Sequence, residues 1–226
     1  MNQPSDLHKT FAANGYAVIP GLFSEEEVRA CKEECVRIVQ EHDPGRSGVL
    51  VGLTLRSRVF KEAAAQPKLV AALKAVIGDH IVFMSDKVVL KNAATDFGSP
   101  WHQDYAYWEG SNKFSVWIAL DDATPDNGCL RVVPGSHLLG YVPHRDESAD
   151  GIGFTNRIGE DQLGQTPVFD FVAKRGDAVI FHDLLFHSSY PNRSGKDRWA
   201  LISTYKDGTK EDPEYPWAGA AFTVSG

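Results

Sequence analysis

The stretch Ser99-Pro100-Trp101-His102-Gln103-Asp104 is the one around which the rest of this chain is organised. His102 and Asp104 are two residues apart, so on an extended backbone both side chains point to the same side. Pro100 favours an extended or turn conformation just before the pair. An imidazole and a carboxylate that converge on one point are two of the three ligands in the 2-His-1-carboxylate triad that binds non-heme Fe(II). The pair predicts a metal site if the chain supplies a second histidine.

Bulky aromatic side chains surround this pair. A His-x-Asp pair alone occurs by chance in many chains, so its neighbours matter. Aromatic residues this dense at a strand end are typical of either a corner of the core or the wall of a pocket. Both interpretations stay open at this point; a pocket wall here would contact a substrate, with Arg131 available to an anionic group. The aromatic residues concerned are Trp101, Tyr105, Tyr107 and Trp108.

The composition is that of an ordinary globular protein. The chain has 226 residues, of which 42% are apolar and 23% charged, and its formal net charge is −7. No basic segment dominates and no apolar run approaches the roughly 18 residues of a membrane span, so we expect neither nucleic acid nor a membrane as a partner. The N-terminal residues lack the features of a signal peptide, and the three cysteines form no metal or disulfide pattern. We expect a cytoplasmic protein that acts on a small molecule as a monomer or homodimer.

Two helices are predicted in the N-terminal third. Ser24 and Glu27 have the spacing of a capping box, and apolar residues at three- and four-residue intervals continue the helix over 25–39. Pro67 suits the first turn of a second helix, which Gly78 ends. The other predictions for this third are a strand within 11–22 and a loop over 42–57.

Beyond Gly78 the chain is rich in short, β-branched and apolar segments. Many short strands separated by turns and not by helices indicate an antiparallel sandwich or barrel. We predict one domain, mainly β with flanking α, which has a helical part over 1–79, a β core over 80–205 and a tail over 206–226. The loop 141–165 and the tail are both candidates for a lid. Strands are predicted at 81–90, 114–120, 130–133, 168–172, 178–181 and 199–205.

The chain contains eight histidines. One of them, His102, belongs to the first pair. Five others lie in polar segments, follow turns or begin a strand. This leaves His182 and His187 as candidates for the second imidazole. His187 enters a turn, and Arg198 heads a strand eleven residues later. In an antiparallel hairpin such a pair can face one cavity, where an arginine suits a carboxylate ligand. His182 as the ligand and Arg198 as a surface ion-pair partner remain alternatives.

Several short motifs occur in a fixed order along nearly the whole chain. They are residues 15–24, Trp101-His102-Gln103-Asp104, Asn127-Gly128-Cys129-Leu130, Pro134-Gly135-Ser136-His137, Gly176-Asp177, and residues 187–192 followed by Arg198. Each motif is weak alone, but their order and the step of eleven from His187 to Arg198 are specific. In these motifs the sequence resembles the phytanoyl-CoA dioxygenase (PhyH-like) family of Fe(II)/2-oxoglutarate-dependent oxygenases.

This resemblance implies a double-stranded β-helix, the jelly roll of cupin-like proteins, with the N-terminal helices packed against it. It implies Fe(II) as the metal, 2-oxoglutarate as the co-substrate and O2 as the oxidant. His102, Asp104 and His187 match the iron ligands of the family. The residues that it assigns to the co-substrate are Arg198 at the distal carboxylate, Ser189 nearby, Trp117 in the wall, and Lys87 or Lys91 on one strand.

The activity implied by the resemblance is that of a dioxygenase of the EC 1.14.11 type. Such an enzyme hydroxylates a small metabolite or natural-product intermediate and releases succinate and CO2. Halogenating relatives replace the carboxylate ligand with a small residue, so Asp104 favours hydroxylation. Desaturation, cyclisation and epimerisation stay open. Two other functions also stay open: a non-catalytic cupin-like metal or ligand binder, and an iron dioxygenase that does not use 2-oxoglutarate.

Overall fold

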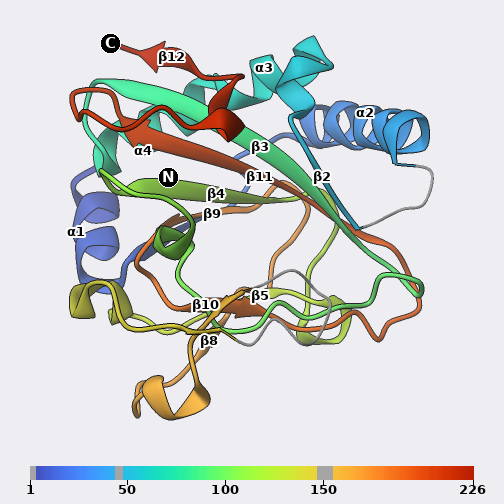
Figure 1. The fold of residues 1–226 in the computed structure, drawn as a ribbon. Helices are drawn as coiled ribbons and strands as arrows, with labels where there is room; N and C mark the ends of the chain where they lie inside the picture. The colour runs from blue at the N-terminus through green and yellow to red at the C-terminus, as the bar shows by residue number, and fades with distance from the viewer. Residues whose placement is uncertain (1–3, 44–47, 147–154) are drawn as a thin grey trace.

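The computed structural model describes residues 4–43, 48–146 and 155–226, and most of its strands form two antiparallel sheets (Figure 1). The strands are β1 (Tyr16–Ile19), β2 (Val49–Val51), β3 (Ile81–Lys91), β4 (Lys113–Ala119), β5 (Leu130–Val132), β6 (Arg145–Asp146), β7 (Asn156–Arg157), β8 (Phe169–Asp170), β9 (Ala178–His182), β10 (His187–Ser189), β11 (Arg198–Asp207) and β12 (Phe222–Ser225). The larger sheet has the order β1-β9-β4-β11-β3-β12, and β2 also pairs with β3. The smaller sheet has the order β10-β5-β8 and lies opposite the larger one. The predicted jelly-roll architecture is confirmed.

Four α-helices of the described ranges pack against the larger sheet; in Figure 1, α2 and α3 lie on its side away from the smaller sheet and α1 stands beside it. They are α1 (Pro4–Asn14), α2 (Glu25–His42), α3 (Arg58–Ala64) and α4 (Pro67–Val76). The predicted capping box opens α2: Ser24 Oγ accepts a hydrogen bond from Glu27 N, and the Glu27 carboxylate accepts one from Ser24 N. The apolar stripe of α2 packs in the core between the helices and the sheet. None of the helices in the described ranges is long and apolar enough to cross a bilayer.

Side chains of the larger sheet serve two cores in alternation. On β11, Trp199 and Leu201 pack towards the helices, whereas Ala200 and Ile202 pack towards the smaller sheet. This follows from the period of two in a strand. The inward residues of the larger sheet therefore face the space between the two sheets, where the candidate ligands lie.

The two ends of the chain differ from the prediction. The predicted strand within 11–22 is present as β1, but β2 lies within the segment predicted as a loop, and both strands join the larger sheet. Helix α1 is unpredicted, because its apolar residues form only a weak stripe in the sequence. The tail contributes β12, which pairs with β3, so it belongs to the sheet. Residues 44–47 and 147–154 of the two predicted loops lie outside the described residues.

Candidate active site

Three side chains from different parts of the chain meet at one point between the sheets. His102, Asp104 and His187 each offer one ligand atom, and these atoms all lie within 4.8 Å of one another. Asp104 Oδ1 is 3.7 Å from His102 Nε2 and 3.5 Å from His187 Nε2. Two imidazoles and one carboxylate on one side of an ion are the donor set of a facial triad, which suits Fe(II).

The backbone holds the two histidines together and also sets their tautomers. His102 N donates to His187 O at 3.0 Å, and His187 N donates to His102 O at 3.1 Å. His102 Nδ1 is 2.8 Å from Pro100 O, and His187 Nδ1 is 2.9 Å from Leu185 O. Since a carbonyl oxygen only accepts, Nδ1 carries the proton in both rings, and each Nε2 presents its lone pair to the common point.

The electrostatics of the triad favour the protonation states that a metal requires. Burial raises the pKa of a carboxyl group, but the neighbouring His187, Lys87 and His102 together hold the pKa of Asp104 well below its usual range. Burial, followed by the charge of His187, lowers the pKa of His102 to about 3. Ser115 Oγ donates to Asp104 Oδ2 at 3.0 Å, which leaves Oδ1 to the histidines. An ionised carboxylate beside neutral imidazole is ready for metal binding.

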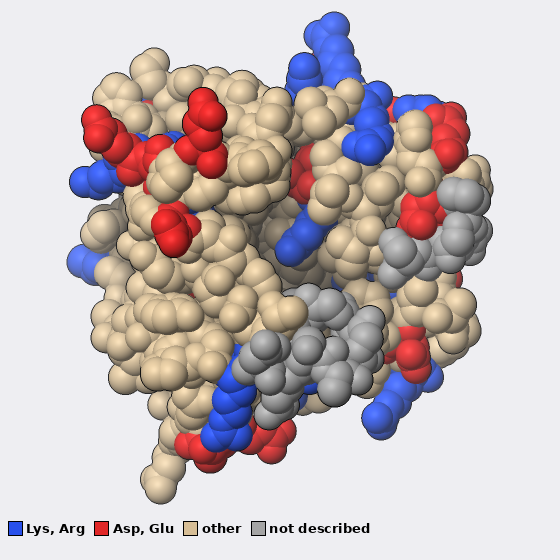
Figure 2. All heavy atoms as spheres, viewed as in Figure 1, with Lys and Arg blue, Asp and Glu red and all other residues tan. Residues whose placement is uncertain are grey.

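The triad lines a cavity of about 380 Å³ between the two sheets. Figure 2 shows a hollow near the centre of the molecular face seen in Figure 1, with a basic side chain at its rim. Apart from the triad, the lining residues are Val49, Lys87, Val89, Lys91, Phe97, Ser99, Tyr107, Trp117, Leu130, Phe181, Ser189, Arg198 and Ile202.

Directly opposed residues of β11 and β3 form one wall of this cavity in three successive rows. The rows are Arg198–Lys91, Ala200–Val89 and Ile202–Lys87. The first row thus consists of two cations and the second of apolar residues, while the third has a single cation. The two lysines stand at opposite ends of the wall, four residues or about 13 Å apart along the strand.

The first row has the features of an anion-binding site. Arg198 and Lys91 are each only 1% exposed. Arg198 Nη2 donates to Gly128 O at 2.9 Å, but the buried Nη1 has no hydrogen-bond partner among the described residues. Lys91 Nζ donates to Ser189 Oγ at 2.7 Å and to Tyr190 O at 2.6 Å. Two buried cations that share no carboxylate in the described structure are costly unless a negatively charged ligand lies between them.

Only one of the five residues predicted for the substrate pocket lines the cavity among the described residues, namely Tyr107. Trp101 is buried in a separate small core beyond the triad. Tyr105 contacts Tyr141, and Trp108 contacts Trp217 and donates its Nε1 to Asp183. Arg131 lies over the rings of Trp101 and Tyr190 and pairs with Asp170.

Local geometry explains this correction. Trp101 and His102 are neighbours on extended backbone, so they point to opposite sides, and the same holds for Leu130 and Arg131. At Asp104 the chain enters a 3₁₀ turn, η2 (Asp104–Tyr107). Residues three apart in such a turn point the same way, which brings Tyr107 back to the side of Asp104. The alternative ligand His182 packs against Phe11, Phe114 and His137, away from the triad.

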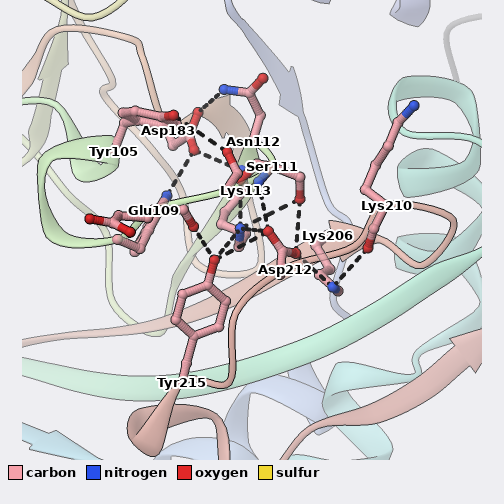
Figure 3. Close-up of polar contacts among 12 residues, drawn as sticks. Tyr105, Glu109, Ser111, Asn112, Lys113, Asp183, Lys206, Lys210, Asp212 and Tyr215 are labelled. Carbon is pink, nitrogen blue, oxygen red and sulfur yellow. Dashed lines mark hydrogen bonds and ion pairs between the residues drawn. The ribbon is translucent and has the colours of Figure 1, made fainter.

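A buried polar network anchors the segment 104–113, which connects the ligand Asp104 to the start of β4 (Figure 3). Asp212 of the tail is 3.0 Å from Lys113 Nζ, and both side chains are almost fully buried. Asp183 accepts from Lys113 N at 2.7 Å and from Trp108 Nε1 at 3.0 Å. Sequence reasoning missed these acids, because each lies 70 or more residues from Lys113 and no motif marks them.

Comparison with known proteins agrees with this geometry. L-proline trans-4-hydroxylase of Streptomyces griseoviridis is 28% identical, over 93% of this chain and 89% of that protein. Peroxisomal phytanoyl-CoA dioxygenase of Rattus norvegicus is 26% identical, over 88% of this chain and 67% of that protein. The solved structure of the epimerase SnoN with Fe3+, alpha ketoglutarate and nogalamycin RO shares the fold, with a TM-score of 0.79 and 23% identity over 93% of this chain and 86% of that chain.

The family description "Phytanoyl-CoA dioxygenase (PhyH)" matches residues 11–200, which include the triad and Arg198. That span covers most of the chain and the whole of the smaller sheet, but it ends within β11 and leaves out β12. The chain therefore belongs to the phytanoyl-CoA dioxygenase family and is an Fe(II)- and 2-oxoglutarate-dependent dioxygenase.

Proposed function

We propose that this enzyme hydroxylates a small-molecule substrate at a site in which His102, Asp104 and His187 bind Fe(II) and the Arg198–Lys91 row binds 2-oxoglutarate. The observation that carries this proposal is the unpartnered, buried Nη1 of Arg198 beside a second buried cation. Neither group forms a salt bridge with a carboxylate of the described residues, so an acidic ligand would supply their direct partner. A dicarboxylate that reaches from this row to the triad places one carboxylate beside these basic side chains and the other beside the metal.

The distal carboxylate of 2-oxoglutarate meets three groups in this assignment. Arg198 Nη1 and Lys91 Nζ donate charge-assisted hydrogen bonds, which are stronger than those between neutral groups. Ser189 Oγ, already within 2.7 Å of Lys91 Nζ, adds a hydroxyl. Trp117 lies beside them, with the Arg198 guanidinium 5.6 Å from its ring centre, and closes the wall. Lys91 takes this co-substrate role in the proposal, whereas the sequence assigned it to Lys87 with Lys91 as the alternative.

The protein contributes position and protonation state to the reaction. When bound, Fe(II) with 2-oxoglutarate and O2 supplies the oxidation of a substrate C–H bond to an alcohol, with succinate and CO2 as the other products. The bonds from Nδ1 to backbone carbonyls keep both imidazoles aimed at the metal. Asp104 supplies the third ligand, which halogenating relatives lack. Tyr107 stands at the open side of the triad, where a substrate enters.

Hydroxylation of a free metabolite is favoured over the two rival functions. A non-catalytic metal binder has no need for buried cations beside the metal ligands. An iron dioxygenase that does not use 2-oxoglutarate has no use for Arg198. The most extensive of the likenesses described above is to a hydroxylase of a free amino acid, which supports a substrate of that size. All three cysteines are unpaired and buried, as suits a reducing cytoplasm.

The test is anaerobic addition of Fe(II) and then 2-oxoglutarate to the purified protein. We expect a visible metal-to-ligand charge-transfer band that Asp104→Ala abolishes and Arg198→Met weakens. Asp122→Ala, which removes an exposed carboxylate, serves as the matched control, and this variant should keep the band. On admission of O2, succinate is released. A wild-type protein that binds Fe(II) but shows neither the band nor succinate would overturn the proposal.

A further inference from the structure

Lys87 is a cation in the active-site cavity for which the co-substrate assignment has no use. Its side chain lines the cavity together with the triad and Tyr107. No hydrogen bond or ion pair joins its ammonium group to any residue of the described ranges, unlike the ammonium of Lys91. Its charge acts on Asp104 and His102, which places it near the metal ligands. It therefore faces the reaction centre with its donors free.

Position excludes Lys87 from the anion site of the first row. Lys87 belongs to the third row, opposite Ile202, and the apolar Val89 row separates it from Arg198 and Lys91. Four residues of β-strand are about 13 Å. One carboxylate cannot contact both ends of this wall.

The charge of the cavity lining also favours an anionic partner for Lys87. Among the described residues, the lining contains three basic side chains, Lys87, Lys91 and Arg198, but only one acid, Asp104. A divalent metal ion adds further positive charge, and 2-oxoglutarate contributes two negative charges. An excess of positive charge then remains, and Lys87 is its most exposed carrier. A buried or half-buried ammonium group gains most from an anionic partner.

We propose that Lys87 binds a carboxylate of the substrate, so that this enzyme acts on small monocarboxylic acids. The inference rests on the proposed function and deepens it. A single ammonium group matches the charge of one carboxylate and can donate charge-assisted hydrogen bonds to it.

The neighbours of Lys87 describe the rest of such a molecule. Val49 and Tyr107 line the same cavity and are 39% and 40% exposed, so they form an apolar rim next to the ammonium group. A cavity of about 380 Å³ that also holds 2-oxoglutarate has room for a molecule of amino-acid size. Lys87 anchors the carboxylate, the rim packs on a short apolar body, and the carbon to be oxidised lies over the triad.

The experiment separates the substrate from the co-substrate as the partner of Lys87. The anaerobic Fe(II)/2-oxoglutarate complex is titrated with small 2-amino, 2-hydroxy and cyclic imino acids, each paired with its own primary amide. Binding is followed by perturbation of the charge-transfer band, and turnover by succinate release. We expect at least one acid to perturb the band and accelerate succinate release while its amide does neither.

Variants of Lys87 complete the test. Lys87→Met should weaken binding of that acid by about tenfold to a hundredfold, the range for loss of a charge-assisted hydrogen bond, and leave the 2-oxoglutarate Kd nearly unchanged. Lys87→Arg should restore much of the acid affinity. Lys174→Met, which removes an exposed lysine, serves as the control.

Three results overturn the inference. They are a weakened 2-oxoglutarate Kd in Lys87→Met, equal responses to acids and amides, and a charge-transfer band that no acid in the set perturbs. Each of these presupposes that the band forms. Absence of the band in the wild type is the separate result that overturns the proposed function.

Discussion

Arg198 and Lys91 lie directly opposite each other on β11 and β3, and both side chains are almost fully buried. Like charges in opposed positions of an antiparallel pair destabilise a sheet. Neither residue forms a salt bridge with a carboxylate in the described parts of the chain. Arg198 therefore disfavours the ammonium form of Lys91, and an acidic ligand between the two side chains favours that form again.

Ligand binding at this row should raise the thermal stability of the protein. A ligand that binds only the native state stabilises it by about 2.7 kcal/mol at a hundred times its Kd. We expect 2-oxoglutarate with Fe(II) to raise Tm in a thermal-shift assay, and Arg198→Met to lose most of this shift. The control is Arg175→Met, which removes an exposed arginine. An equal shift in both variants would contradict the assignment of the row.

The affinity for 2-oxoglutarate should depend on pH through Lys91. Burial, followed by the charge of Arg198, lowers the pKa of Lys91 to about 6. Above that pH the free enzyme holds a neutral amine, whereas a bound carboxylate favours the ammonium form. Binding then takes up a proton, so the affinity falls as pH rises, by up to about tenfold per pH unit.

Calorimetry in two buffers of different ionisation enthalpy measures this proton uptake, and a titration of the charge-transfer band gives the Kd at each pH. In Lys91→Met the affinity should be weaker and its dependence on pH should disappear. A wild-type Kd that stays constant from mildly acidic to alkaline pH would refute this role of Lys91.

Ser115 should control the iron affinity without binding the metal. Its hydroxyl donates to Asp104 Oδ2 and so orients the carboxylate. Loss of such a supporting hydrogen bond typically weakens metal affinity by about tenfold to a hundredfold. We expect this for Ser115→Ala in a competition titration with an Fe(II) chelator. Ser188→Ala is the control, because the Ser188 hydroxyl is buried without a partner in the described residues.

Gly128 should be indispensable to the anion site. It has φ of +92°, and a Cβ atom there would lie 2.8 Å from Tyr190 O and 2.8 Å from Lys91 Cδ. Gly128→Ala therefore displaces Lys91 and weakens 2-oxoglutarate binding. Gly195→Ala has the same type of backbone strain, with φ of +72°, but open space around the new methyl group. Binding should fall in the first variant and persist in the second; equal losses would show that backbone strain alone matters.

The ion pair between Asp212 and Lys113 should dominate the stability of the tail. Removal of one partner leaves a buried charge uncompensated, which costs about 3–5 kcal/mol. We expect Asp212→Ala to lower the free energy of unfolding in urea by about 3 kcal/mol, the lower end of that range, because Lys113 Nζ keeps its bond to Ser111 O. Lys206→Ala should cost less, since Lys113 remains paired with Asp212. Equal effects of the two variants would show that the pair is not specially stabilising.

Part of the site was predictable because its geometry is local. The step of two from His102 to Asp104 puts both ligands on one side of an extended segment, and alternating apolar residues mark most strands of the larger sheet. The spacing from His187 to Arg198 also predicted that both residues face one cavity, and both line it in the structure. The sides to which Tyr105, Tyr107 and Trp108 point were not predictable, because a 3₁₀ turn begins after Gln103 and ends the alternation of an extended backbone.

The sequence by itself determined an antiparallel β fold and a candidate His-x-Asp metal pair, since both depend on short-range spacing of side chains. The jelly roll and the 2-oxoglutarate chemistry followed from the resemblance to the family. Tertiary structure decided everything that depends on pairing across the sheets. It joined His102 to His187 by two backbone hydrogen bonds across 85 positions, set Lys91 and not Lys87 opposite Arg198, and placed Asp212 against Lys113. The physical reason is register: strand pairing places residues that are remote in the chain in contact, and a shift of one residue would turn each of these side chains to the opposite face.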